Sequence, residues 1–410
     1  MIYLERAKTA PIDLMIQRSA PDICYMPVSN NNTSWVSRAK SLNIQADKEQ
    51  IKLVVQRLCQ KMPHLQSLTI IEVDDYRYRH NYSWTASPGG SIPFPQNFFG
   101  NHAPSLQTLT FHSVSPSNTF TFPLPKLTHI NWVAETAHVS IERLLELFES
   151  SPLLEDIKMH VLVLRVSNLP LQEVTLNELH KLDWADCDGA ISLVPCLVAP
   201  KLSHLKINVT HNLKPRCQGI TETTLSSLLS PDPHRIPLLL KPINVWYACE
   251  PSSRSFGYLT SSGARLHVTE NGSFTSCWFS QYLPISFLGT QKLELNVKVT
   301  RNLNLPPLDD FAIGRFENLS ELDFVGEVDL LAHLISGQPV PCTALSKISI
   351  NPTKYDHQWA IVNLMRVLDG RKEAGHEVKT VEIRSFGNMK DIKSWGSKRV
   401  VDEVRATRYV

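Results

Sequence analysis

Residues 104–111 read Pro104-Ser105-Leu106-Gln107-Thr108-Leu109-Thr110-Phe111: a proline, a spacer, a leucine, two residues, an aliphatic residue, one residue and a large apolar residue. The same phrase occurs at 63–70, 125–132, 152–159 and 200–207. Without the spaced proline it recurs at Leu171/Val174/Leu176, Leu319/Leu322/Phe324, Leu345/Ile348/Ile350 and, more weakly, Val378/Val381/Ile383. Internal repetition of this kind indicates a repeat architecture and a binding surface rather than a reaction.

Each copy of the phrase predicts a short strand. Its last two apolar residues are two positions apart, so they point to the same face of a strand. Burying three such side chains contributes roughly 5–8 kcal/mol, whereas ordering each backbone residue costs about 1–2 kcal/mol. A single unit therefore cannot fold alone and must stack on its neighbours, as in a solenoid. The proline suits the entry to the strand, because it cannot continue a preceding helix.

Amphipathic helical patterns precede several copies. One begins at Ile51 and another at Ile141, and similar patterns begin at Val328 and Ile361. A helix, a short link and a strand in repetition predict an α/β leucine-rich-repeat solenoid. We expect an irregular horseshoe, with parallel strands on its concave face and helices on its convex face. The usual Asn or Cys after the strand is missing, and the repeat spacing is uneven. An ordinary α/β domain with leucine-rich strands is the alternative.

The pattern divides the chain into three parts. Residues 1–46 are expected to form a lead-in or cap, with a strand at 12–16, a turn at 30–34 and an edge strand around 42–44. Irregular repeats are expected over 47–385, with an insertion at 74–103 and a weak pattern at 211–290, which is interpreted as diverged repeats rather than a domain joint. Residues 386–410 are expected to form a helical cap, because 397–407 resembles a closing helix.

Composition limits the function classes. Of the 410 residues, 42% are hydrophobic and 20% are charged, which is typical of a folded protein. The formal net charge is +2, so no nucleic-acid or membrane-surface partner is expected. The chain has eight cysteines and no CxxC pair, which favours reduced thiols. No secretory signal or membrane span is recognisable. A cytoplasmic or nuclear protein is therefore predicted.

Sequence motifs of catalysis are missing. The chain has no HExxH, P-loop, dinucleotide-type glycine pattern or GxSxG. Asp183, Asp186, Cys187 and Asp188 lack the spacing of a cation-binding loop and are interpreted as a solvated bend. We expect no catalytic residue, no cofactor and no metal site.

Polar strand residues that point away from the core are the candidate partner-binding residues. They are His129, Asn131, Asp156, Lys158, Glu173, Thr175, His204 and Lys206. His112 and His160 lie just beyond two of the strands. If the strands stack in parallel, these side chains form one polar stripe, although any exposed strand face must also be polar. The aromatic residues of the 76–99 insertion are a second candidate contact, since aromatics are enriched in binding hot spots. They could equally pack the loop itself.

The opening stretch, Tyr3-Leu-Glu-Arg-Ala-Lys-Thr-Ala-Pro-Ile-Asp-Leu-Met-Ile16, together with the repeats resembles a large class of fungal F-box proteins. In that class an F-box precedes such a phrase, and leucine-rich repeats follow it. The resemblance implies the substrate-recognition part of a cullin-type ubiquitin ligase. The F-box, which holds the Skp-family linker, is not found in this sequence, so linker binding is assigned to no residue here.

The leading expectation is therefore a non-catalytic protein-interaction module that presents a protein target to ubiquitin-ligase components, if an F-box is supplied upstream. A stand-alone structural or scaffolding repeat protein, or a diverged remnant without a ligase link, is the alternative. An enzyme such as an α/β hydrolase with unrecognised motifs ranks third. The sequence does not identify the target.

Overall fold

The computed structural model divides the chain into two compact units, which are described separately below. Unit 1 comprises Met1–Thr210 with Ser230–Pro237, and unit 2 comprises His211–Leu229 with Leu238–Val410. The structure describes residues 10–17, 37–73, 92–93, 98–112, 114–115, 123–165, 172–185, 193–210, 235–236, 242–250, 253–271, 289–297, 316–336, 341–352, 358–384 and 403–407.

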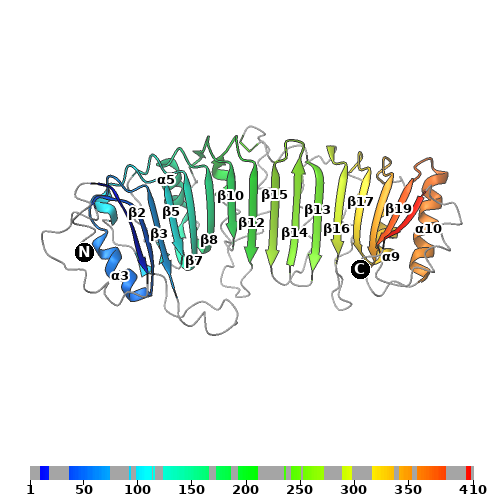
Figure 1. The fold of residues 1–410 in the computed structure, drawn as a ribbon. Helices are drawn as coiled ribbons and strands as arrows, with labels where there is room; N and C mark the ends of the chain where they lie inside the picture. The colour runs from blue at the N-terminus through cyan, green and yellow to red at the C-terminus, as the bar shows by residue number, and fades with distance from the viewer. Residues whose placement is uncertain are drawn as a thin grey trace. The chain divides into compact units, whose positions relative to one another are not determined.

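Unit 1 is built on a parallel sheet. Neighbouring strands follow the order β1-β2-β3-β5-β7-β8-β10-β12, and every pairing between them is parallel (Figure 1). The strands are β1 (Ile12–Gln17), β2 (Ala39–Ala46), β3 (Ser67–Glu72), β5 (Thr108–His112), β7 (His129–Ser140), β8 (Asp156–Arg165), β10 (Lys181–Ala185) and β12 (His204–Thr210). The strands of the five proline-containing phrases lie in this one sheet, as the repeat pattern predicts.

A β-turn opens each repeat and places its proline. The backbone N–H of the leading leucine donates to the carbonyl three residues earlier, as in Leu106 to Ala103 at 3.2 Å and Leu127 to Leu124 at 3.0 Å. The proline of the phrase is then the second residue of the turn, where its fixed φ is favourable. The prolines therefore favour a turn that directs the leucine into the core, in addition to ending whatever precedes the strand.

Backbone hydrogen bonds connect each turn to the preceding repeat. The carbonyl of Gln66 accepts from the N–H groups of Gln107 and Thr108, and the carbonyl of Gln107 accepts from Thr128 and His129. The pattern continues through the carbonyls of Thr128, Glu155 and His180. Each repeat thus satisfies polar groups of its neighbour, which is the coupling expected of a solenoid-like stack.

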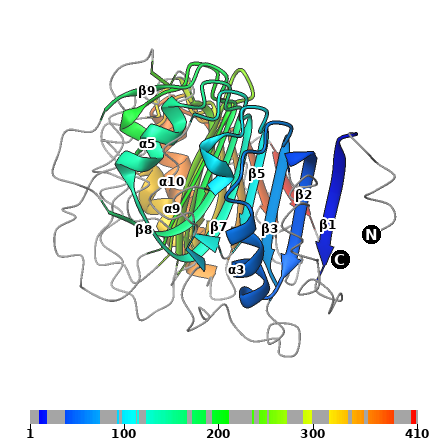
Figure 2. The same ribbon diagram turned by 90° about the vertical axis from the view of Figure 1, so that its left-hand side faces the viewer.

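The core of unit 1 lies on the side of the sheet that its helices cover. Helix α3 (Lys48–Arg57) begins after Asp47, whose side chain accepts from the N–H of Gln50 at 2.9 Å. Helix α5 is Ile141–Glu149. Figure 2 shows both helices on one side of the strands. The inward apolar residues of the five proline-containing phrases are at most 4% exposed, so they form the core of this unit.

Short elements complete unit 1. Two-stranded parallel pairs are formed by β4 (Ile92–Pro93) with β6 (Val114–Ser115), and by β9 (Val174–Thr175) with β11 (Leu197–Val198). The 3₁₀ segments are η2 (Phe98–Asn101) and η3 (Val194–Cys196).

Unit 2 has a mixed sheet with the order β15-β14-β13-β16-β17-β18-β19-β20. Strand β14 pairs antiparallel with both β13 and β15, and the pairings from β13 through β20 are parallel. The strands are β13 (Pro242–Glu250), β14 (Ser253–Thr260), β15 (Arg265–Asn271), β16 (Lys292–Val297), β17 (Glu321–Gly326), β18 (Lys347–Pro352), β19 (Thr380–Arg384) and β20 (Glu403–Thr407).

Two helices of unit 2 pack on one face of these strands: α9 (Val328–Ile335) and α10 (Gln358–Glu373). The turn that opens each repeat of unit 1 recurs here, with Leu319 N–H donating to the Phe316 carbonyl at 3.1 Å and Leu345 to Cys342 at 3.0 Å. Arg371 of α10 is buried and donates to the carbonyls of Pro341 and Cys342 at 2.7 and 2.8 Å. It thus binds the turn that leads into β18.

The structure corrects four expectations. The segment around 42–44 is not at an edge, because β2 lies between β1 and β3. The weak segment contains the antiparallel strand β14, so it is not simply a run of diverged parallel repeats, and the boundary of the units falls at its start. Residues 403–407 form strand β20 where a closing helix was expected. The phrase at Leu171/Val174/Leu176 does not supply a strand of the large sheet, because β9 pairs with β11 instead.

Candidate protein-binding surface

The sheet face of unit 1 opposite its helices carries polar side chains in register. Because neighbouring strands pair directly, His129 lies beside Asp156 and Asn131 lies beside Lys158. Asp156 and Lys158 lie in turn beside Lys181 and Asp183 of β10, which adjoin His204 and Lys206 of β12. Six of the eight predicted binding residues are therefore brought together. The polar face of unit 1 is defined as His112, His129, Asn131, Asp156, Lys158, His160, Lys181, Asp183, His204 and Lys206.

Ion pairs between neighbouring strands neutralise the carboxylates of this polar face. Lys181 Nζ lies 3.2 Å from Asp156 Oδ2, and Lys206 Nζ lies 3.7 Å from Asp183 Oδ2. Such partly exposed pairs contribute little to stability, about 0–1 kcal/mol each. Lys158 forms no ion pair with another described residue. It is therefore the cation that remains in excess on the polar face.

His112 lies at the end of β5 in an environment that opposes its protonation. Burial lowers the pKa of the His112 imidazole, and the positive charges of Lys158 and His160 lower it further. Its Nε2 atom is buried and has no hydrogen-bond partner among the described residues. The same is true of Asn131 Oδ1 on the neighbouring strand. Buried polar atoms without partners are uncommon in folded proteins and require an explanation.

Glu173 and Thr175 do not belong to the polar face of unit 1, which is a correction. Glu173 precedes β9 and Thr175 belongs to it, and β9 pairs with β11 rather than with the large sheet. Both residues are exposed there, and Glu173 forms an ion pair with Arg235.

Lys181 and Asp183 take the places predicted for Glu173 and Thr175. The phrase Leu179/Leu182/Trp184 has the same spacing as the other copies, and all three side chains are fully buried. Two overlapping leucine patterns start eight positions apart, and neither carries the proline of the phrase. Only the second pattern ends in a large aromatic residue, Trp184, as the copy at 125–132 ends in Trp132. This residue was the signal that distinguished the second pattern. Asp186, Cys187 and Asp188, which follow β10, lie outside the described residues.

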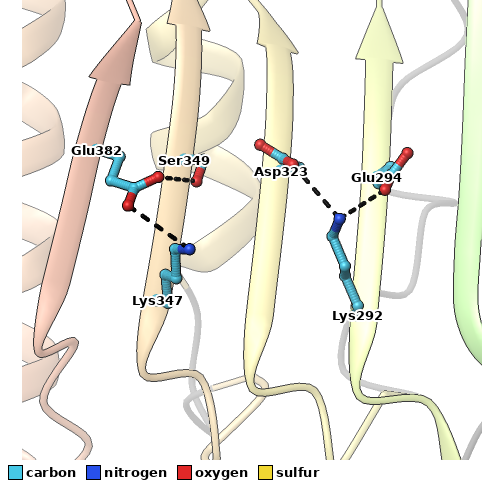
Figure 3. A network of polar contacts seen from close by, with 6 residues as sticks. All are labelled: Lys292, Glu294, Asp323, Lys347, Ser349 and Glu382. Carbon is cyan, nitrogen blue, oxygen red and sulfur yellow. Dashed lines mark hydrogen bonds and ion pairs between the residues drawn. The ribbon is translucent and has the colours of Figure 1, made fainter. Parts of the chain in front are cut away.

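Unit 2 has a comparable polar face of opposite charge balance. Lys292 Nζ lies 2.7 Å from Glu294 Oε1 and 3.7 Å from Asp323 Oδ2. Glu382 accepts a hydrogen bond from Ser349 Oγ at 3.1 Å and lies 3.6 Å from Lys347 Nζ. Figure 3 shows these six side chains on the open side of the strands, with the helices behind. The hydrogen bond that Lys292 donates to Glu294 is the main factor that raises the pKa of Lys292, so its ammonium stays charged.

An aromatic pair extends this polar row onto β13 and β15. Trp246 pairs with Gly257 of β14, and Gly257 pairs with His267 of β15. The Trp246 and His267 rings have centroids 6.0 Å apart in an edge-to-face arrangement. Trp246 lies beside Glu294 on the other side, so an aromatic surface adjoins a carboxylate row. Sequence reasoning missed this pair because it lies in the weak segment.

The other candidate contact is only partly described. Phe98 and Phe99 of the aromatic insertion are buried and pack against each other at 4.0 Å between centroids. Tyr76, Tyr78, Tyr82, Trp84 and Phe94 lie outside the described residues. Phe98 and Phe99 therefore serve packing rather than an exposed contact.

Cys59, Cys196 and Cys342 are not in disulfides, and burial raises the pKa of each thiol. Within the described ranges, no group of His, Cys, Asp and Glu has the arrangement of a metal site. None of the helices in those ranges combines the length and the apolar character that crossing a bilayer requires.

No protein-family model and no curated protein matches the chain.

Proposed function

We propose that the chain is a protein-interaction module of the leucine-rich-repeat class that binds its partner on the polar face of unit 1. The carrying observation is the register of this face: ten polar side chains from five parallel strands form a continuous surface. Parallel sheets are usually covered on both faces. Here the described helices α3 and α5 cover one face, and a half-buried polar surface occupies the other.

The open face suits protein recognition more than chemistry. Its two carboxylates, Asp156 and Asp183, form ion pairs with Lys181 and Lys206 of the neighbouring strands. Interfaces between proteins combine such polar groups with well-packed surroundings and depend on complementary charge. The resemblance of 3–16 and the repeats to fungal F-box receptors gives the proposed setting, which is target presentation to a ubiquitin ligase.

The proposal is tested by quantitative affinity capture of the full chain from a native extract. His129 is exposed and His204 is half-buried, so His129→Glu with His204→Glu changes the face without altering the core. Arg143→Glu, at an exposed position of helix α5, is the matched control. The proposal predicts at least one protein that the wild type and the control capture equally and the face variant loses. Equal capture by all three chains contradicts it.

The ligase setting has its own readout in the same capture. Enrichment of a Skp-family linker and a cullin together with the target supports it. A target whose capture depends on the polar face, but which is recovered without the linker or the cullin, favours the stand-alone scaffold.

A further inference from the structure

The open face of unit 2 holds three carboxylates around one lysine. Lys292 donates a hydrogen bond to Glu294, and this bond is the main factor that raises the pKa of Lys292. The negative charges of Asp323 and Glu321 raise it further. Glu294 Oε1 and Asp323 Oδ2 lie 2.7 and 3.7 Å from Lys292 Nζ (Figure 3). A single ammonium group therefore faces carboxylates from both its own strand and the neighbouring strand.

The next lysine of this face does not restore the balance of charge. Lys347 is the direct neighbour of Glu321 on β18, and it lies 3.6 Å from Glu382 of β19. Lys347 and Glu382 together add no net charge. In the other direction along the sheet, strands β13 and β14 separate Arg265 of β15 from Glu294. Negative charge therefore exceeds positive charge among the side chains that the structure describes on β16–β19.

Trp246 places an aromatic surface directly beside these carboxylates. It is the cross-strand neighbour of Glu294, and it points to the open face because the adjacent Val245 is buried in the core. The indole is partly exposed, and its edge-to-face contact with His267 lies on the side away from Glu294. Such a ring beside a carboxylate attracts a cation through both groups. The tryptophan site is defined as Trp246, Lys292, Glu294, Glu321 and Asp323.

We propose that the tryptophan site binds an arginine side chain of a partner protein. The guanidinium stacks on the indole of Trp246 and donates to the carboxylate of Glu294, whose side chain is 52% exposed. Arginine suits the site better than lysine, because its planar guanidinium stacks on an aromatic ring while its several N–H groups bind a carboxylate. A positively charged segment of the partner also complements the negative charge of this face.

The ion pair of Lys292 is compatible with this binding. Lys292 donates to Oε1 of Glu294, and Oε2 of the same carboxylate can accept from the guanidinium. The tryptophan site lies on unit 2, so the inference goes beyond the proposed function, which concerns the polar face of unit 1.

The test uses fluorescence anisotropy with the full chain and a labelled peptide of Gly-Arg repeats. Peptides of the same length with Gly-Lys and Gly-Gln repeats are the comparisons. We expect the arginine peptide to bind about tenfold more tightly than the glutamine peptide and about threefold more tightly than the lysine peptide. Salt screens the attraction between exposed charges, so the measurement is made at low ionic strength.

Two variants of the tryptophan site separate its charge from its ring. Glu294→Gln is expected to weaken the arginine peptide by about fivefold, and Trp246→Leu is expected to abolish the preference for arginine over lysine. His267→Gln removes the same ring contact but keeps the indole, so it should retain the preference. Glu373→Gln changes an exposed carboxylate of helix α10 and should stay within about twofold of the wild type. Circular dichroism checks the fold of each variant.

Equal binding of the arginine and glutamine peptides overturns the inference, and so does equal binding of the arginine and lysine peptides. Unchanged affinity in Glu294→Gln overturns it even if Trp246→Leu fails to fold. A loss in Glu373→Gln as large as that in Glu294→Gln also overturns it, because the attraction would then be diffuse. None of these outcomes bears on the polar face of unit 1, which the capture experiment tests separately.

Discussion

The rings of Trp246 and His267 meet across an intervening strand, with centroids 6.0 Å apart, because the residue between them is Gly257. A side chain at position 257 would point to the same face as the two rings, because the three residues are direct cross-strand neighbours. A glycine inside a strand commonly marks such a close approach. The contact ties the antiparallel segment of unit 2 together on its open face.

Replacing this glycine should separate the rings. Gly257→Val is expected to destabilise the protein by about 1–3 kcal/mol, since it overpacks a filled site. Urea denaturation followed by circular dichroism measures the change. Ser255→Val, two residues away on the same face of β14, is the matched control and is expected to stay within about 0.5 kcal/mol of the wild type. A neutral Gly257→Val would show that the rings do not need this space.

Loss of the buried Arg371 side chain of α10 should destabilise the protein. Arg371→Met leaves the carbonyls of Pro341 and Cys342 without their donors and is expected to cost about 2–4 kcal/mol. Arg366→Met changes an exposed arginine on the same helix and is expected to be nearly neutral. Chemical denaturation of both variants gives the comparison. Similar losses in both would argue against a structural role for the buried guanidinium.

The turn that opens each repeat predicts where a new proline is tolerated. The copy of this turn at 176–179 has Asn177 as its second residue. The N–H of the preceding Leu176 donates to the carbonyl of Val198 and so continues the pairing of β9 with β11. Asn177→Pro is expected to stabilise the protein by about 0.4–1 kcal/mol, because it restricts the unfolded chain. Thr343→Pro occupies the equivalent place after Cys342, whose φ is +49°. It is expected to destabilise, since a residue before proline prefers extended backbone. Thermal unfolding separates the two outcomes.

Stability should fall with acid because of His112. Burial and the charges of Lys158 and His160 lower its pKa in the folded chain, so the unfolded chain binds the proton more readily. The stabilising contribution is present above the unfolded pKa of about 6.5 and is lost as pH falls through the folded pKa. His112→Gln should flatten the dependence of unfolding free energy on pH between 7.5 and 5, and Lys158→Gln should flatten it partly. Parallel curves for all three proteins would contradict this assignment.

Much of the fold follows from the repeated phrase alone. The leucine and aromatic positions of 104–111 have one spacing that fits a strand, and the proline marks the turn before it. The helices at 48–57 and 141–149 were predictable because their apolar residues recur at helical spacing. The parallel register then followed from repetition, and with it six of the eight predicted residues of the polar face.

The wrong predictions share one physical cause, which is that residue spacing does not determine which strands pair or in which direction. Around 171–184 two leucine patterns overlap with the same spacing, and spacing alone does not select Leu179 and Leu182 over Leu171 and Val174. Strand β14 reverses direction because of its connections, and strand direction leaves no trace in residue spacing. The segment Glu403–Thr407 contains the helix-forming residues Glu403, Arg405 and Ala406, yet it pairs with β19, so strand pairing prevails over local propensity.

Photo-crosslinking in cells gives the most direct test of the central claim that the polar face of unit 1 is the partner-binding surface. A photoreactive phenylalanine replaces Asn131 on the polar face, and a second chain carries it at Glu149, at the end of α5 on the covered side. A discrete crosslinked protein is expected from position 131, and none is expected from position 149. Crosslinks of equal yield from both positions, or from position 149 alone, would contradict it.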